Sequence, residues 1–139
     1  MAPTEQRASI VAETSPPVVY LVDDDEAVRD SLTILLESHG LLVRGYESAL
    51  AFLADAKPAV RACLVLDLHM PGMSGLDLLE QAPPQRLGMP VVVISGRADP
   101  DAKKRALAAG VQAVLDKPFR DDDLLMAIAH ALDKPLPGI

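Results

Sequence analysis

Side chains with acidic, hydroxyl or ammonium groups stand at or directly after four apolar runs of this 139-residue sequence. They are Asp23 and Asp24 after VVYLV, Asp67 in LVLDLHMPGMSG, Ser95 in PVVVIS and Lys117 in LDKPF. Carboxylates that lie close together repel one another, and a hard divalent cation such as Mg²⁺ offsets that repulsion through oxygen ligands. A cation, an ammonium group and a hydroxyl group around one carboxylate are suited to hold a phosphoryl group. We therefore expect Asp67 to be a nucleophile that forms an acyl phosphate, with Mg²⁺, or Mn²⁺ in its place, as the cofactor.

Each of these residues also has a structural interpretation when it is taken alone. Acids after a strand often cap helices, Ser95 before a glycine suits a turn, and a lysine such as Lys117 is usually exposed. The chemical interpretation gains its support from the joint occurrence of these residue types at the ends of four different strands.

Short apolar runs alternate with helical segments along the chain, which is typical of βα units on a parallel sheet. The expected strands are VVYLV, LLVRGY, ACLVL, PVVVIS and QAVL, and the expected helices span about 26–39, 48–54, 74–82, 100–109 and from 121 onward. ACLVL and PVVVI are apolar throughout and predict central strands, whereas Arg44 and Gly45 indicate an edge strand. In an open parallel sheet the carboxyl ends of the strands lie along one edge, where ligands bind. The functional side chains should converge at that edge.

Helix caps and apolar faces follow from the same pattern. Asp25 is expected to cap the first helix, and the spacing of Ser74 and Asp77 resembles a capping box at the third. Apolar spacing predicts the core-facing side chains of the first, second and fifth helices: Val28, Leu32, Leu35 and Leu36; Leu50 and Leu53; and Leu124, Leu125, Ile128 and Leu132.

Composition and charge limit the partners. The formal net charge is −7, from 20 acidic and 13 basic residues, so direct binding of nucleic acid by this chain is not expected. Cys63 is the only cysteine and lies in an apolar run, which favours a buried thiol and a reducing compartment. No apolar run is long enough to predict a membrane span, and no signal peptide is recognisable, so we expect a cytoplasmic protein. Residues 1–17 are expected to form a flexible leader, 18–133 one domain and 134–139 a short tail.

Four segments in order, VVYLVDDDEAVRDSL, LVLDLHMPGMSGLDLL, PVVVISG and LDKPF, resemble the receiver domain of two-component response regulators over about residues 18–132. Within that family, the sequence is most similar to the receivers of nitrogen-fixation-type (FixJ-like) transcriptional regulators. The resemblance implies an α/β fold of flavodoxin type, a doubly wound (βα)5 unit with a parallel five-stranded sheet in the order 2-1-3-4-5. It also implies a cis Lys117–Pro118 peptide bond.

The resemblance assigns roles around the expected metal. Asp67 would be the phosphoacceptor and a metal ligand, Asp24 a direct metal ligand, and Asp23 would hold metal-bound water. The main-chain carbonyl of His69 would complete the ligands that the protein supplies.

The resemblance also assigns a phosphoryl-binding pair and a switch. Ser95 would move to bond the phosphoryl group, and Lys117 would pair with it. Val114 stands where the family usually has an aromatic residue that turns inward as the hydroxyl residue moves, so transmission is expected to depend on the loop after Ser95. His69 and Arg97 stand where the family tunes the lifetime of the phosphoryl group, although both also suit exposed loop positions.

Partners are implied by the resemblance as well. The donor would be a sensor histidine kinase or a phosphotransfer protein, and an unidentified output partner would dock on the fourth helix, fifth strand and fifth helix. The chain would catalyse its own phosphorylation and dephosphorylation without being an enzyme for other substrates. It would be a monomer or a dimer whose formation depends on phosphorylation.

Several functional classes remain to be compared. The first is a single-domain switch, because little sequence follows the fifth helix, and the second is the receiver portion of a DNA-binding transcription regulator. A haloacid-dehalogenase type of hydrolase is disfavoured because His69 stands where a second acid is expected. A nucleotide-binding relative of flavodoxin is disfavoured because no glycine-rich loop follows the first strand.

Overall fold

The computed structural model describes residues 16–56, 61–96 and 99–133. A parallel five-stranded sheet in the order β2-β1-β3-β4-β5 forms its centre, which confirms the expected topology. The strands are β1 (Val18–Val22), β2 (Leu42–Tyr46), β3 (Ala62–Asp67), β4 (Val91–Ser95) and β5 (Ala113–Asp116). The strand with Arg44 and Gly45 lies at an edge, and the two fully apolar strands lie inside the sheet, as predicted.

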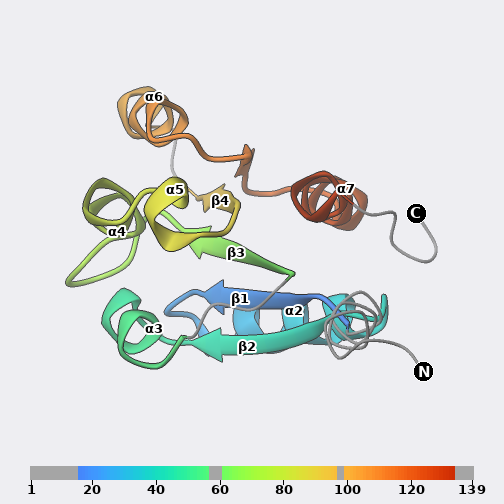
Figure 1. Cartoon of the computed structure of the whole chain (residues 1–139). Helices are drawn as coiled ribbons and strands as arrows, with labels where there is room; N and C mark the ends of the chain where they lie inside the picture. Colours follow the sequence, from blue (N-terminus) through green and yellow to red (C-terminus); the bar gives the residue numbers. More distant parts are fainter. Residues whose placement is uncertain (1–15, 57–60, 97–98, 134–139) are drawn as a thin grey trace, which may run out of the picture.

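Helices cover both faces of this sheet (Figure 1). They are α2 (Glu26–Glu37), α3 (Ala49–Asp55), α4 (Gly75–Gln81), the single-turn α5 (Pro84–Leu87), α6 (Pro100–Ala108) and α7 (Asp121–Leu132). Side chains of α3, α4 and α6 pack on one face, and those of α2 and α7 pack on the other. In β3, Leu64 and Leu66 face the first group while Cys63 and Val65 face the second. Every residue of β3 is therefore buried, and its carboxyl end is a rigid support for a functional group.

The predicted caps are confirmed. Asp25 accepts hydrogen bonds from the N–H groups of Ala27 and Val28 at the start of α2. Ser74 and Asp77 form a reciprocal capping box at the start of α4. The first turn of each helix is thereby fixed directly beside a functional loop, between β1 and α2 in one case and between β3 and α4 in the other.

The predicted face of α3 is wrong. Leu50 and Leu53 are 62% and 42% exposed, whereas Phe52 is buried. The ring of Phe52 packs edge-on against Tyr20 and Tyr46, with centroid distances of 5.8 and 5.6 Å. Edge-on contacts of one ring with two others are favourable beyond the apolar surface they bury, so the helix presents Phe52 to the core.

Other helices differ from expectation only in detail. The helix α2 ends at Glu37, two residues earlier than predicted. Its side chains Leu32 and Leu36 are buried, whereas Val28 and Leu35 are only partly buried against the same core. In α7, Leu124, Leu125 and Ile128 are buried as predicted, whereas Leu132 is only partly buried. The short α5 was not predicted, and it places a proline at the first helical position.

Candidate functional site

The predicted functional side chains converge at the carboxyl edge of the sheet. Asp23 follows β1, Asp67 ends β3, Ser95 ends β4, and Lys117 follows β5. Ser95 is in register with Asp116, the last residue of β5. Four different strands therefore deliver these groups to one edge of the sheet, as the alternation of strands and helices predicts.

Three carboxylates form the centre of this site. Asp23, Asp24 and Asp67 each offer an oxygen, and these oxygens all lie within 4.8 Å of one another. Asp23 is 1% exposed and Asp67 is 6% exposed, while Asp24 faces solvent. Such closely spaced acids, two of them buried, are costly to keep ionised without a compensating positive charge.

Burial and hydrogen bonding act in opposite directions on the two buried acids. Desolvation raises the pKa of Asp23 and of Asp67 above the usual value of 3.8, and repulsion from neighbouring aspartates adds to the effect. Hydrogen bonds from main-chain N–H groups lower both pKa values: Asp25 donates to Asp23 at 2.9 Å, and His69 donates to Asp67 at 3.1 Å. The positive charge of Lys117 also lowers both pKa values. The main-chain hydrogen bonds and Lys117 thus offset part of the cost of ionising Asp23 and Asp67. Further positive charge is needed to offset the rest.

The residues fit a hard divalent cation. Asp23 Oδ2 is buried, and no hydrogen-bond donor within the described residues reaches it. Lys117 Nζ lies 3.8 Å from this oxygen, which is an ion-pair distance but too long for a hydrogen bond. A buried carboxylate oxygen without a donor, together with the oxygens of Asp24 and Asp67, matches the oxygen ligands that Mg²⁺ prefers.

The acidic group opens toward a groove between the two neighbouring loops. Asp24, His69, Met70, Pro71 and Ser74 line this space of about 370 Å³. His69 is half-buried, and its Nε2 atom is buried without a hydrogen-bond partner among the described residues. The groove gives access to the acidic group from the side of the loop between β3 and α4.

A glycine that sequence reasoning missed lies close to the end of β3, which carries Asp67. The Gly75 N–H donates to the carbonyl of Leu68 at 3.0 Å. A Cβ atom at Gly75 would lie 2.1 Å from the main-chain oxygen of Asp67, so only glycine lets α4 approach the strand this closely. The available signal was a glycine at the first helical position, directly after the cap Ser74, where other residues form helices better.

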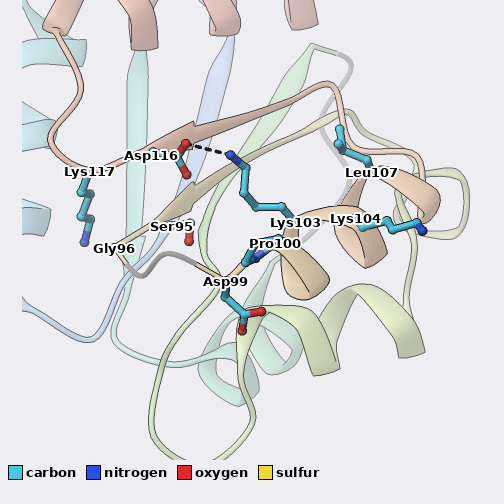
Figure 2. A pocket seen from close by; sticks show the side chains of 9 residues that line it. All are labelled: Ser95, Gly96, Asp99, Pro100, Lys103, Lys104, Leu107, Asp116 and Lys117. Atoms are coloured by element: carbon cyan, nitrogen blue, oxygen red, sulfur yellow. Dashed lines mark hydrogen bonds and ion pairs between the residues drawn. The ribbon is translucent and has the colours of Figure 1, made fainter.

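Ser95 and Lys117 border a second hollow. A cavity of about 580 Å³ lies between the loop after β4, α6 and β5, and Ser95, Lys103, Leu107 and Lys117 are among its lining residues. Figure 2 shows Lys103 reaching across to Asp116, with Nζ 2.8 Å from Oδ2, while Lys117 points away from this pair. Lys117 is therefore available to the acidic group, and the Lys103–Asp116 ion pair links α6 to the end of β5.

The remaining sequence predictions have mixed outcomes. Val114 lies in β5, half-buried and in register with Val93. The Lys117–Pro118 peptide bond is cis, as the resemblance implied. Cys63 is buried, and burial raises the pKa of its thiol to about 12, which makes it unreactive at neutral pH. Arg97 lies outside the described residues.

Within the part of the chain that the structure describes, no helix has the length and apolar character needed to cross a membrane.

Comparisons with known proteins agree with this geometry. The family model for the response regulator receiver domain matches residues 19–129. The chain is 41% identical over 116 residues to the transcriptional regulatory protein FixJ of Azorhizobium caulinodans, covering 84% of this chain and 55% of that protein. It is 44% identical over 115 residues to the response regulator protein TmoT of Ectopseudomonas mendocina, covering 83% of this chain and 52% of that protein.

A solved structure gives the same result for the fold. The crystal structure of FixJ-N superimposes with a TM-score of 0.76 at 38% identity, covering 86% of this chain and 96% of that one. The chain spans about half the length of the curated relatives that it matches. Because the family model covers most of the chain and the relatives share its sequence and fold, this protein belongs to the response regulator receiver domain family.

Proposed function

We propose that this chain is a cytoplasmic switch of a two-component signalling system, in which Asp67 accepts a phosphoryl group. The observation that supports the proposal most strongly is the convergence of three carboxylates, two of them buried, with Lys117 Nζ 3.8 Å from Asp23 Oδ2. The phosphoryl donor in this proposal is a phosphohistidine of a sensor histidine kinase or of a phosphotransfer protein.

The transfer requires an ionised Asp67. One oxygen of this carboxylate attacks phosphorus, the bond from phosphorus to the donor imidazole nitrogen breaks, and that nitrogen keeps the electron pair. The hydrogen bond from the His69 N–H to Asp67 Oδ1 orients the carboxylate for this attack. Since β3 is buried along its whole length, the nucleophile is held on a rigid support.

The other residues of the site divide between the metal and the phosphoryl group. Asp24 would coordinate Mg²⁺ directly, with Asp23 holding its water and the main-chain carbonyl of His69 as a further ligand. When bound, Mg²⁺ offsets the negative charge of the carboxylates and of the phosphoryl oxygens. Lys117 would pair with a phosphoryl oxygen, and the hydroxyl of Ser95 would donate a hydrogen bond to another. Mn²⁺ has similar ligand preferences and would substitute for Mg²⁺.

Phosphorylation would shift an equilibrium between two arrangements of α6 and β5. The cavity supports this proposal, because it leaves space beside Ser95, Gly96 and α6 for such a rearrangement. With Val114 in place of an aromatic residue, we assign transmission to the movement of Ser95 and its loop. The surface formed by α6, β5 and α7 would then bind the output partner or a second copy of the chain.

We distinguish two settings for this switch. FixJ is named a transcriptional regulatory protein, and the chain spans about half of its length, which supports a role as the receiver portion of a transcription regulator. The other setting is a single-domain switch that binds a separate partner. The coding sequence downstream of residue 139 distinguishes them, because the first setting requires a DNA-binding region there.

Substitution of the proposed nucleophile tests the function. We expect the wild-type chain to gain the mass of one phosphoryl group from acetyl phosphate and Mg²⁺, and Asp67→Asn to gain none, because the amide is not a nucleophile under these conditions. The matched control is Asp30→Asn, which removes an exposed carboxylate of α2 and should be labelled like the wild type. Acid-labile, hydroxylamine-sensitive labelling of Asp67→Asn would falsify the proposal.

A further inference from the structure

An arginine outside the acidic group holds the loop that carries two of its members. Arg29 lies on α2 and is half-buried, and its Nη1 atom donates a hydrogen bond of 2.6 Å to the main-chain carbonyl of Asp23. A guanidinium bond to a partly buried carbonyl is charge-assisted and stronger than a bond between neutral groups. This contact ties α2 directly to the backbone of the proposed metal site.

The peptide groups around Asp23 are fixed at several points. The Asp23 N–H donates to the carbonyl of Tyr46 in β2 at 3.2 Å, and Asp23 Oδ1 accepts from the N–H of Asp25. The carbonyl of Asp23 belongs to the peptide group that continues into Asp24. By binding this carbonyl, Arg29 fixes the plane of that peptide group and hence the direction in which the exposed carboxylate of Asp24 leaves the backbone.

The edge strand provides the space for this arginine. The side chain of Arg29 passes Gly45 of β2, and a Cβ atom at Gly45 would lie 3.7 Å from Arg29 Cδ. That distance is an ordinary van der Waals contact, so alanine would fit there, whereas a larger branched side chain would occupy the path of the arginine. The absence of a side chain at Gly45 therefore leaves the path of Arg29 open beside β2.

Arg29 acts on the backbone of the site. Its hydrogen bond goes to the neutral main-chain carbonyl of Asp23 and not to a carboxylate of the acidic group, so its effect on the site is to order the backbone.

We infer that Arg29 is a positioning residue that holds the Asp23–Asp24 turn in the geometry that binds the divalent cation. This inference rests on the proposed phosphotransfer function. Without the bond from Arg29, the turn would sample other peptide orientations, and cation binding would have to restrict them. The affinity for the cation would fall by the cost of that ordering.

Direct measurement of cation binding tests the inference. Mn²⁺ binding is followed by the electron paramagnetic resonance signal of the free ion, and Mg²⁺ binding by calorimetry, in the wild type and in Arg29→Met. Methionine keeps an apolar stem beside Gly45 but cannot donate the hydrogen bond, so we expect the dissociation constant to rise about 10-fold, as for other groups that orient metal ligands. Arg29→Lys retains a donor and should recover most of the affinity. Arg44→Met, which removes an exposed positive charge from β2, should bind both ions like the wild type.

Substitutions at Gly45 provide an independent test of the same contact. Gly45→Val should displace the arginine and weaken Mn²⁺ binding to the same extent as Arg29→Met, whereas Gly45→Ala should leave binding unchanged. In labelling by acetyl phosphate, the Mg²⁺ concentration for half-maximal rate should rise for Arg29→Met, with the rate at saturating Mg²⁺ close to that of the wild type. A purely structural role would lower thermal stability without this shift.

Two results would overturn the inference, and a third would overturn the proposed function. Unchanged Mn²⁺ affinity in folded Arg29→Met, or equal affinities of Gly45→Val and Gly45→Ala, would show that Arg29 does not position the turn. Either result would contradict the role of Arg29 but not the proposed metal site, provided that Asp23→Asn still weakens Mn²⁺ binding. If Asp23→Asn and Asp24→Asn both bind Mn²⁺ like the wild type, the metal site itself is wrong, and the proposed function fails with it.

Discussion

At the level of single residues, burial and chemistry make opposite demands on Asp67. The proposed phosphoryl transfer needs the ionised carboxylate, whereas burial raises the pKa of Asp67 and so favours the protonated form in the folded protein. Because the folded state then binds more protons than the unfolded state between the two pKa values, the free energy of unfolding decreases as pH rises through that window. Above the raised pKa, the full cost of ionising the buried carboxyl opposes folding.

Because ionisation of the buried Asp67 carboxyl opposes folding, removal of its negative charge should stabilise the metal-free protein. In EDTA at neutral pH, we expect Asp67→Asn to have a larger free energy of unfolding than the wild type, because the amide replaces a buried carboxylate with a neutral group of similar shape. The difference should shrink as pH falls through the raised pKa toward the usual value of 3.8, since the wild-type carboxyl becomes neutral as well.

Urea denaturation at several pH values measures this difference. Asp30→Asn, which changes an exposed carboxylate of α2, controls for the change in net charge and should show a smaller effect. Addition of Mg²⁺ should stabilise the wild type more than Asp67→Asn, because a ligand that binds only the folded state adds to its stability. A variant that is less stable than the wild type in EDTA at neutral pH would contradict the electrostatic account.

The acidic group could be predicted from the sequence because its residues stand at the ends of apolar strands. The residues that support it, Gly75 and Arg29, could not, because they act through contacts with distant parts of the chain. A carboxylate such as Asp67 at the end of a wholly apolar strand is an unusual residue for its environment, so it is visible in the sequence. Gly75 acts through a close approach between backbones, and Arg29 through a bond to a carbonyl on another element. Apolar spacing contains no trace of either contact, and the only local signal was the glycine that follows the cap Ser74 at the start of α4.

At the level of elements, the length of a helix decides how well its buried face can be predicted. In α3, which has seven residues, the pairs Leu50–Leu53 and Ala49–Phe52 both have a spacing of three. In so short a helix, apolar spacing alone does not determine which of the two pairs is buried. The contact between the rings of Phe52 and Tyr20 favours burial of Ala49 and Phe52. The longer α2 and α7 repeat their apolar spacing over more turns, and their buried faces were predicted correctly.

The contact between α4 and β3 leads to a prediction at the same level. We expect Gly75→Ala to lower the free energy of unfolding by about 1–3 kcal/mol, the usual cost of overpacking a close contact. The added Cβ would meet the main-chain oxygen of Asp67, and a backbone atom cannot turn aside as a flexible side chain can. Labelling by acetyl phosphate should also slow, because the end of β3 has to shift.

Another glycine of the chain provides the matched control. Gly88 has a left-handed backbone with φ of 76°, and a Cβ there would meet nothing within 4 Å. Gly88→Ala should therefore cost only the conformational strain of about 1 kcal/mol and leave labelling unchanged. Urea denaturation and the labelling rate test both variants. If Gly75→Ala were labelled as fast as Gly88→Ala, the close approach of α4 would have no part in positioning the phosphoacceptor.

At the level of the whole molecule, the proposed switch has to connect a buried site to a surface. Ser95 is 1% exposed at the end of β4, and the next described elements along the chain are α6 and β5. The Lys103–Asp116 ion pair joins those two elements, but both side chains are substantially exposed, so its contribution to stability is small, about 0–1 kcal/mol. A weak link of this kind allows α6 to change position without a large energetic cost.

Removal of the Ser95 hydroxyl should separate phosphorylation from its structural response. We expect Ser95→Ala to be labelled by acetyl phosphate, because Asp67 and the proposed metal ligands remain, but to lose most of the shift in α6 and β5. Amide chemical shifts with and without beryllofluoride measure this response, and the wild type should show large changes in both elements. Ser31→Ala, which removes an exposed hydroxyl from α2, should respond like the wild type. If the amide chemical shifts of α6 and β5 change in Ser95→Ala as they do in the wild type, Ser95 does not transmit the phosphorylation signal. Lys117 would then be the next residue of the site to test for this role.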